Sequence, residues 1–461
     1  MSVHEITRRE FLRRSASLGV AGAAAPWALS LATIGEASAA AAAGDYKALV
    51  CVFLYGGNDY GNTLVPYDSV SYAAYAGIRQ SLATSRASLA ATVLSPAVAL
   101  PDATRQMALA PQLAPLKSLF DRGDMAVLLN VGALIQPTTL AQYKAGSVPL
   151  PPKLFSHNDQ QSFWQSSLPE GATSGWGGRI GDLFLSSNGT STFTCINVSG
   201  NAVFMSGQSA VQYQIGPGGA VILRAVSGPL YGSQACSTAL NSLITNTNAG
   251  NSMQAEYSRV TRRALDVNAQ VTAALGRLPV LATAFDASNA LATQLQMVAK
   301  LIAARSALGA SRQVFFVSLG GFDNHNYLVD QHPALLASVA NAVSSFQAAT
   351  VELGVANAVT TFTASEFGRT LTSNGDGSDH GWGSHHFVVG GAVRGRRYFG
   401  SLPAVAVNGP DDVGQGRLLP TTSVDQVAAT LATWMGVSAS DLPLVVPNIG
   451  NYTLCNLGLF A

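Results

Sequence analysis

The fold is decided by the stretch Ala-Leu-Val-Cys-Val-Phe-Leu at residues 48–54, which continues as Tyr-Gly-Gly-Asn-Asp at 55–59. An uninterrupted apolar run of this length, ended by glycines, is typical of a buried central strand in a parallel sheet. The polar residues that follow lie at the carboxyl end of the strand, where ligands bind in open α/β sheets. We therefore expect a site next to Asn58 and Asp59.

Four further apolar runs have the same strand character. They lie at residues 125–130, 313–319, 358–363 and 387–389. Apolar residues at helical spacing lie around 113–119 and over 333–353, and another helix is expected to start at Ser423, with Gln426 completing a capping box. Strands that alternate with helices predict a doubly wound α/β fold with a mainly parallel sheet.

The segment 165–310 breaks this alternation. It is rich in Ser, Gly, Asn and Ala, with weak strand patterns near 193–198 and 220–223 and helical spacing over 254–302. We therefore expect one α/β domain over residues 40–461, in which 165–310 is a long insertion and a candidate cap over the site.

The composition excludes two classes of protein. Charged residues make up 11% of the 461 residues and hydrophobic residues 48%, whereas an average soluble domain has about 25% charged residues. A disordered chain needs low hydrophobicity and high net charge, so that class is excluded. The 26 basic and 25 acidic residues leave a net charge of +1, without the basic excess of nucleic-acid binders. We expect no nucleic-acid partner.

The N-terminus resembles a twin-arginine export signal. Residues 7–13 read Thr-Arg-Arg-Glu-Phe-Leu-Arg, no charge follows over 15–35, and Ala-Ser-Ala at 37–39 offers a cleavage site between small residues. We expect residues 1–39 to be a signal peptide and the mature chain, near Ala40 onward, to be periplasmic or secreted, with no membrane span after cleavage. A retained N-terminal membrane anchor is the alternative.

The four cysteines do not form a metal-binding pattern. No Cys-x-x-Cys is present, so a zinc ribbon is excluded. Cys51 lies inside the first predicted strand as a small apolar residue. Cys195 and Cys236 are candidates for a disulfide in an oxidising compartment, and the alternative is that all four thiols are free.

Acidic residues and histidines gather after the predicted strands. If these strands are neighbours in one sheet, five of these side chains converge at one edge. They are Asp59, Asp323, His325, Glu366 and His380. Mixed carboxylate and imidazole ligands suit Zn²⁺, Mn²⁺ or Fe better than Ca²⁺. We therefore predict a site for one or two divalent ions, which would polarise an ester oxygen or lower the pKa of bound water.

Each of these residues also has a structural alternative. Asp59 could form a turn, Asp323 or His325 could cap a helix, and Glu366 could pair with Arg369. A site at this edge also makes Asn58, Arg369 and Asp379 candidates for binding the substrate.

A second polar cluster reads Leu-Phe-Ser-His-Asn-Asp-Gln-Gln at 154–161 and opens a predicted helix. A helix N-terminus favours an anion, so Ser156 is a candidate nucleophile and His157 a candidate ligand or acid–base group. The alternative is an N-cap serine beside a surface histidine. Nothing here matches the Gly-x-Ser-x-Gly nucleophile elbow.

An ordered set of motifs runs through the whole mature chain. Besides the leader, the motifs lie at 53–59, 154–161, 320–325 (Gly-Gly-Phe-Asp-Asn-His), 365–369 (Ser-Glu-Phe-Gly-Arg), 379–383 (Asp-His-Gly-Trp-Gly) and 419–426. On these motifs the chain resembles the bacterial, twin-arginine-exported domain-of-unknown-function 1501 family. That family is grouped with the alkaline phosphatases and sulfatases, which implies a doubly wound, alkaline-phosphatase-like α/β core and metal-dependent hydrolase ancestry.

The resemblance implies roles for particular positions. The superfamily's metal ligands fall on Asp59, Asp323, His325, Glu366 and His380, and its nucleophile falls near Ser156. A histidine of the superfamily is replaced by Phe367, so one ligand is missing. The resemblance implies an exported metal-dependent hydrolase of small-molecule or polymer phosphate or sulfate esters. The departure at Phe367 implies the alternative, a non-catalytic binding or assembly protein with a co-exported protein partner.

Overall fold

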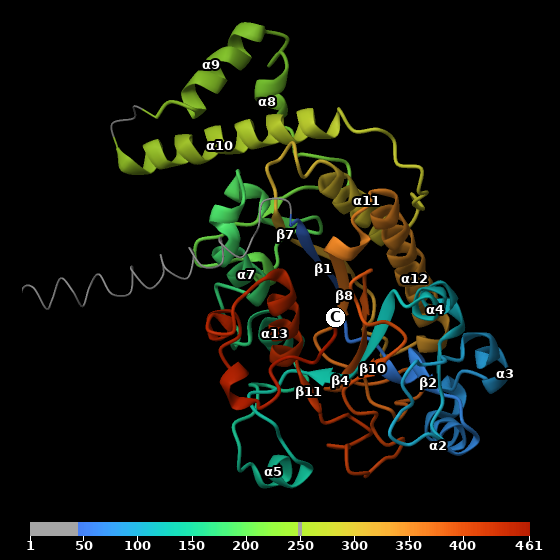
Figure 1. The fold of residues 1–461 in the computed structure, drawn as a ribbon. Helices are drawn as coiled ribbons and strands as arrows, with labels where there is room; N and C mark the ends of the chain where they lie inside the picture. Colours follow the sequence, from blue (N-terminus) through green and yellow to red (C-terminus); the bar gives the residue numbers. More distant parts are fainter. Residues whose placement is uncertain (1–44, 248–250) are drawn as a thin grey trace, which may run out of the picture.

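The computed structural model describes residues 45–247 and 251–461. The predicted twin-arginine motif, the uncharged stretch after it and the cleavage site all lie outside these residues. Figure 1 shows a central sheet with helices packed on its two faces and a group of helices that stands out beyond one end of it.

The central sheet has nine strands in the order β10-β4-β9-β8-β1-β7-β5-β6, with β11 also paired to β4. The strands are β1 (Lys47–Leu54), β4 (Met125–Gly132), β5 (Cys195–Asn197), β6 (Tyr213–Gln214), β7 (Arg312–Leu319), β8 (Val359–Ala364), β9 (Ser384–Val389), β10 (Tyr398–Phe399) and β11 (Thr422–Ser423). A separate antiparallel pair joins β2 (Leu64–Pro66) to β3 (Met107–Leu109).

Parallel pairing dominates the central sheet. Strand β1 pairs in parallel with both β7 and β8, and β5 pairs in parallel with β7. The exception is β9, which is antiparallel to β8 and to β4. The predicted α/β fold with a mainly parallel sheet is thus confirmed.

The side chains of β1 alternate between two cores, which explains why its sequence is apolar throughout. Val50 and Val52 face one core, and Cys51 and Phe53 face the other. Helices cover both faces, as a doubly wound fold requires. One face carries α4 (Ala114–Arg122), α11 (Ala290–Ala303) and α12 (Leu328–Glu352), and the other carries α6 (His157–Ser166), α7 (Trp176–Phe184), α13 (Val424–Met435) and α14 (Leu442–Val445).

Two predicted helix starts can be compared with the structure. Ser423 caps α13, and Ser423 and Gln426 form both bonds of the predicted capping box. Helix α12 begins at Leu328 and carries Pro333 inside it, whereas the sequence predicted a start at the proline. A proline near the helix start removes one backbone hydrogen bond, and the buried apolar face of α12 outweighs that loss.

Among the described residues, α12 is the one helix long and apolar enough to suit a membrane span by length and composition. Half of its most apolar window is buried, and its buried side chains include Leu336, Val339 and Phe346. Its apolar character therefore belongs to the protein core, where it packs against α11 and α4.

The segment 165–310 contributes to the core in several places. Strand β5 pairs with β7 in the central sheet, and α7 and α11 are largely buried. The predicted strand at 220–223 is wrong, because Val221, Ile222 and Leu223 are exposed and lie in a loop. These apolar residues have no neighbouring strand to pair with, which a weak sequence pattern cannot reveal.

The part of this segment that projects is formed by α8 (Arg224–Ser227), α9 (Gln234–Ile244) and α10 (Ser252–Leu275) (Figure 1). Helix α10 shares a cavity with Ser191 and Thr192, which directly precede the parallel strand β5. It therefore lies near the amino end of β5, whereas the predicted site residues follow carboxyl ends. This placement does not support a cap over the site.

The other α-helices in the described residues are α2 (Ser69–Arg79), α3 (Arg86–Leu89) and α5 (Leu140–Ala145). All four cysteines are free thiols; Cys195 is buried and Cys236 is exposed, so the candidate disulfide between them is not formed.

Candidate metal centre

The candidate centre is built by segments that follow β7 and β8, by the start of α6 and by the loop before β9. Asp323 and His325 lie after β7, Glu366 lies two residues after β8, and His157 opens α6. His380 comes from the loop before β9. Hydrogen-bond-range contacts connect all five side chains. Strands β7 and β8 flank β1 in the sheet, so the segments at their carboxyl ends lie at the same edge and supply Asp323, His325 and Glu366, as expected in an α/β sheet.

The rings of His325 and His380 are each held through Nδ1. His380 Nδ1 lies 2.7 Å from the carbonyl oxygen of Phe155, and His325 Nδ1 lies 3.2 Å from Asp379 Oδ1. A carbonyl or carboxylate oxygen accepts hydrogen bonds, so each Nδ1 carries the proton. In the neutral rings, both Nε2 atoms are then left with a free lone pair.

Both Nε2 atoms lie close to the same carboxylate, that of Asp323. The two Nε2 atoms lie 2.9 Å apart, and each lies 3.1 Å from Asp323 Oδ1. Two imidazole lone pairs and a carboxylate oxygen repel one another unless a cation is shared among them. The arrangement thus calls for a proton or a metal ion between His325, His380 and Asp323.

His157 adds a third imidazole to the cluster. Its Nδ1 lies 2.9 Å from Glu366 Oε1, so Nδ1 donates and Nε2 is again the acceptor. That Nε2 lies 3.4 Å from Asp323 Oδ2, the carboxylate oxygen that does not contact His325 or His380 at this range. Ligand atoms of His157, Asp323 and His380 all lie within 4.8 Å of one another.

The cluster fits a transition metal by donor type and by spacing. Neighbouring ligand atoms of one ion, bound at about 2.0–2.2 Å, lie on the order of 3 Å apart. The separations among His325, His380 and Asp323 are 2.9 and 3.1 Å. Metal-ligating histidines typically donate their second N–H to a carboxylate or a backbone carbonyl, as these rings do.

The pKa values follow from burial and from these partners. Burial lowers the pKa of His380, although its bond to the Phe155 carbonyl opposes this, and the ring is kept neutral. The hydrogen bond to Glu366 raises the pKa of His157. Burial would raise the pKa of Asp323, but the Arg369 guanidinium together with the nearby His157 and His325 outweighs burial and holds that pKa below its usual value.

Arg369 orients Asp323 from the buried side of the cluster. Its guanidinium is fully buried, and Nη1 donates to Asp323 Oδ1 at 2.5 Å and to the Gly56 carbonyl at 3.1 Å. Nη2 donates to the Ser378 carbonyl. Arg369 was predicted to bind substrate, yet these protein acceptors occupy its donors, so it acts in this structure by orienting Asp323.

Glu366 and Asp379 support histidines here. Glu366 was predicted as a ligand, but its Oε1 accepts hydrogen bonds from Gly56 N, Gln161 Nε2 and His157 Nδ1 instead of facing Asp323. Asp379, predicted to bind substrate, holds His325 and accepts from Asn374 Nδ2 at 2.8 Å. Both carboxylates thus contact the Nδ1 side of a histidine ring and hold the ring in place, while the Nε2 side faces the centre.

Asp59 and Asn58 do not join the cluster. Both oxygens of Asp59 bond the buried Arg79, and Oδ1 also accepts from Gly61 N at 3.1 Å, so the carboxylate is enclosed in an ion pair and caps a short turn. Asn58 is buried, with its side chain bonded to Thr63 and His332. We leave Asp59 out of the ligand set for this reason.

Ser156 also points elsewhere. Its Oγ donates to Asp159 Oδ2 at 2.9 Å, three residues along the chain. Asp159 lies 3.5 Å from Lys153 Nζ. Ser156 is the residue before α6, as the sequence indicates, but its hydroxyl makes no capping bond. The local bond to Asp159 gives no support to Ser156 as the nucleophile.

The sequence analysis gave no role to Gln161 or to the Phe155 carbonyl, and it did not foresee the contact that Phe367 makes. Gln161 donates to Glu366, and its position one helical turn after His157 would have indicated a shared face. The carbonyl of Phe155 holds His380, where a positive φ of 73° turns the backbone, and no sequence signal marks this. The ring of Phe367 stacks on His380, with centroids 4.7 Å apart.

Gly56 allows the loop after β1 to approach the loop of Asp323. Its φ is +118°, and a Cβ there would lie 2.3 Å from Asp323 N and 2.7 Å from Phe322 C. We expect Gly56→Ala to destabilise the fold by about 1–3 kcal/mol and to weaken metal binding, because the backbone of Asp323 must move. Denaturant unfolding and metal titration measure the two effects.

Gly123→Ala is the matched control for this substitution. Gly123 also has a positive φ, of +91°, but nothing lies within 4 Å of a Cβ there. It should show the cost of the left-handed backbone, about 1–2 kcal/mol, and leave metal affinity unchanged. Equal metal affinity in Gly56→Ala and the native protein would contradict the close approach described here.

Glu366→Gln tests the role of the outer carboxylate. Gln keeps an acceptor oxygen for Gly56 N and Gln161, but it removes the negative charge that makes His157 more basic. Loss of such a supporting carboxylate typically weakens metal binding about 10–100-fold, and we expect an effect in this range, with an unchanged far-UV circular dichroism spectrum. Competition with a chelating dye measures it; unaltered affinity would mean that Glu366 does not act on the centre.

The comparisons with known proteins give a family and some distant structures. No curated protein matches this chain. Similar solved structures include the PsFucS1 sulfatase from Pseudoalteromonas sp., at 9% identity and a TM-score of 0.35, covering 90% of this chain and 72% of that one. Another is Ps i-CgsB, at 10% identity and a TM-score of 0.36, covering 88% of this chain and 77% of that one. Similarity at this level says nothing about activity.

A family model, described as "Protein of unknown function (DUF1501)", matches residues 46–443. This match covers nearly all of the described chain, from the start of β1 to α14, and includes every residue of the candidate metal centre. The chain therefore belongs to the DUF1501 family.

Proposed function

We propose that the protein is an exported, metal-dependent hydrolase of phosphate or sulfate esters. The observation that carries the proposal is the convergence of the Nε2 atoms of His325 and His380 on Asp323, with each Nδ1 held by an acceptor. A set of lone pairs arranged in this way is what a divalent metal requires. The predicted leader at residues 1–39 supports export by the twin-arginine route to the periplasm or beyond.

Asp323, His325 and His380 are the proposed ligands, because their converging atoms lie 2.9–3.1 Å apart, whereas His157 Nε2 lies 3.4 Å from Asp323 Oδ2. A Zn, Mn or Fe ion bound there would supply a Lewis acid that polarises an ester oxygen. The side chains of Asp323 and His325 are partly exposed, so an ester group could reach them from solvent.

His157 is the proposed acid–base group. Its Nε2 faces the second oxygen of Asp323 at 3.4 Å, and Glu366 fixes the ring through Nδ1. A histidine held in this way can take a proton from an attacking water and return it to the leaving group. The Glu366 carboxylate stabilises the charged ring that forms during this transfer, as the raised pKa of His157 indicates.

The first test is a screen of aryl phosphate and aryl sulfate esters with protein purified without chelators. We expect hydrolysis that is lost on chelation and restored by Zn²⁺ or Mn²⁺. A metal-loaded, folded protein that turns over neither ester class would overturn the proposed activity. His157→Ala should then retain metal yet lose turnover, which separates its proton transfer from metal binding.

The alternative function is a non-catalytic binding or assembly protein, and Phe367 favours it. The Phe367 ring lies against His380 and against His157, with centroids 4.7 and 4.9 Å apart, where the family resemblance implies a histidine ligand. Phenylalanine has no atom that can coordinate a metal. This position therefore supplies no ligand for a second ion, and the cluster offers ligands for one. Under this alternative the protein stays folded after chelation, turns over no ester, and co-purifies with a co-exported partner.

A further inference from the structure

The projection formed by α8–α10 exposes apolar side chains, although most of the molecule buries them. Its exposed apolar residues include Leu243, Met253, Tyr257 and Val260, and the loop just before α8 also exposes Val221 and Ile222. Figure 1 shows the amino-terminal half of α10 extending beyond the body of the protein. An exposed apolar surface of this kind in a soluble domain indicates an interaction site.

Seven apolar residues of α10 follow one another at a regular spacing of alternately four and three residues. They lie at positions 253, 257, 260, 264, 267, 271 and 274. This is the a/d pattern of a coiled coil, sustained over the whole helix. The second half of the stripe, from Val267 to Ala274, is buried in the protein core, whereas Met253, Tyr257 and Val260 are 84%, 62% and 44% exposed.

Helix α9 covers a different side of α10. Ser258 is buried, and Arg262 Nη2 donates to the Thr245 carbonyl at the end of α9 at 2.6 Å. Positions 258 and 262 lie one turn apart on the side opposite the a/d stripe. The exposed half of the stripe is thus left without a helix beside it among the described residues.

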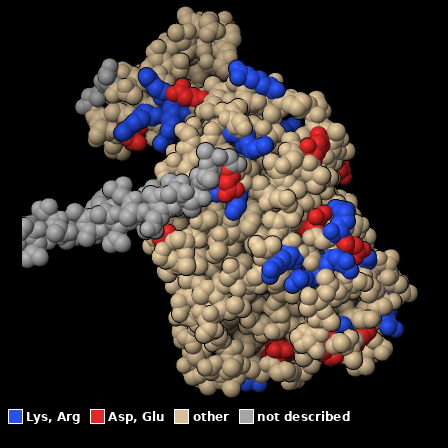
Figure 2. All heavy atoms as spheres, in the orientation of Figure 1, with Lys and Arg blue, Asp and Glu red and all other residues tan. Residues whose placement is uncertain are grey.

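The charged residues that flank this stripe would pair with the opposite charges of a second copy of the helix. Glu256 and Arg263 lie seven residues apart at the flanking g positions of the pattern. Glu256 also forms an exposed ion pair with Arg259 of its own helix. In an antiparallel pair of identical helices, g positions face each other, so Glu256 of one copy meets Arg263 of the other, and the pair occurs twice. Figure 2 shows basic and acidic side chains together on this projection, on a face that is otherwise mostly uncharged.

We propose that α10 docks against α10 of a second copy of this chain in an antiparallel, two-fold symmetric pair. In the register that joins Glu256 to Arg263, Tyr257 faces Val260 of the second copy and Met253 faces Ala264 of the second copy. The exposed half of the stripe is then covered by the same half of the second copy. The buried half remains in the core of its own chain.

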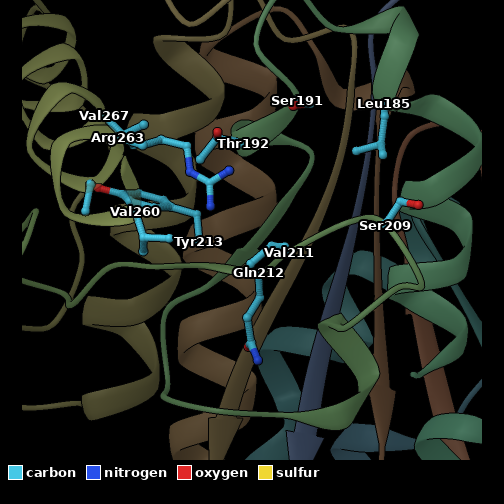
Figure 3. A pocket seen from close by; sticks show the side chains of 11 residues that line it. Leu185, Ser191, Thr192, Ser209, Val211, Gln212, Tyr213, Val260, Arg263 and Val267 are labelled. Carbon is cyan, nitrogen blue, oxygen red and sulfur yellow. The ribbon is translucent and has the colours of Figure 1, made fainter. Parts of the chain in front are cut away.

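A cavity lies where Met253 of the second copy would enter. It has a volume of about 200 Å³ and separates α10 from the body of the protein (Figure 3). Val260, Ala264 and Val267 line it from α10, and Leu185, Val211 and Tyr213 line it from the other side. Methionine adapts to irregular apolar gaps, so its thioether suits this cavity.

The test is the mass of the full chain in solution, measured by sedimentation over a wide range of protein concentrations. We expect a reversible dimer. Met253→Asp should raise the dimer dissociation constant by about 100-fold or more, because a buried apolar contact becomes a buried charge. Val280→Asp is the matched control, since Val280 is 96% exposed and lies outside the stripe, and it should have no effect.

Charge reversal tests the register independently. Glu256→Arg should raise the dissociation constant by about tenfold, because two attractions become two repulsions. Adding Arg263→Glu should restore native affinity. A monomer at every concentration would overturn the proposal, as would a dimer indifferent to Met253→Asp, a failure of the double reversal to restore affinity, or a different protein bound to the stripe without self-association.

Discussion

Replacing Asp323 by alanine is expected to abolish stoichiometric metal binding and all metal-dependent ester hydrolysis. Asp323 Oδ1 lies 3.1 Å from Nε2 of both His325 and His380, so its removal leaves the two imidazoles without the anionic ligand between them. Loss of a direct ligand should exceed the about 10–100-fold weakening typical of a supporting residue. Elemental analysis after dialysis, with a metal titration of the chelated protein, measures the effect.

Two further variants separate the loss of a metal ligand from a loss of stability. Asp323→Ala also removes an acceptor from the buried Arg369, which can lower stability. Asp323→Asn keeps an oxygen for Arg369 while removing the charge, so its loss of metal would not be a folding effect. Asp330→Asn changes an exposed carboxylate in the next segment and should leave metal content unchanged. Stoichiometric metal in folded Asp323→Ala would rule out the centre as we describe it.

The sheet was predictable because its central strands are buried on both faces. The bounds of β1, β4, β7 and β8 differ from the predicted ones by no more than two residues, since continuous apolar runs mark such strands. The antiparallel direction of β9 was not predictable, because an apolar run carries no information on strand direction. Of the projecting helices, only α10 overlaps the predicted helical region 254–302; α8 and α9 were not predicted, and the placement of all three depends on tertiary packing.

The sequence predicted where the candidate site lies, but not which of its residues are metal ligands and which orient the ligands. Position after a strand identified Asp323, His325 and Glu366, and position before the strand at 387–389 identified His380; all four lie in one cluster. Which carboxylate contacts which nitrogen depends on atoms separated by up to 225 residues, such as the Phe155 carbonyl on His380. Spacing along the chain does not distinguish a ligand from a residue that orients one.

Asp59 shows the same limit most clearly. It follows β1 directly, which is where a ligand would be expected in this fold class. Its partner, Arg79, lies at the end of α2, and nothing in the sequence links the two residues. The structure encloses both side chains, so the carboxylate is committed to the guanidinium.

Asp59→Ala is accordingly expected to destabilise the protein by about 3–5 kcal/mol while leaving the metal content of the folded fraction unchanged. The variant leaves the Arg79 guanidinium buried with a charge and no carboxylate; its remaining acceptor within 3.3 Å is the Thr370 carbonyl. An unpaired buried charge is costly because neither water nor an anion compensates it. Denaturant unfolding of the chelated protein measures this loss without a contribution from metal.

Removing both charges separates an ion pair from a metal ligand. The double variant Asp59→Ala with Arg79→Met should recover much of the stability lost in Asp59→Ala, because methionine fills part of the space without a charge. If Asp59 were a ligand, Asp59→Ala would lose metal, and Arg79→Met would restore neither metal nor the stability that metal provides. A metal-free Asp59→Ala protein with native unfolding behaviour would thus return Asp59 to the ligand set and refute its assignment to the buried ion pair.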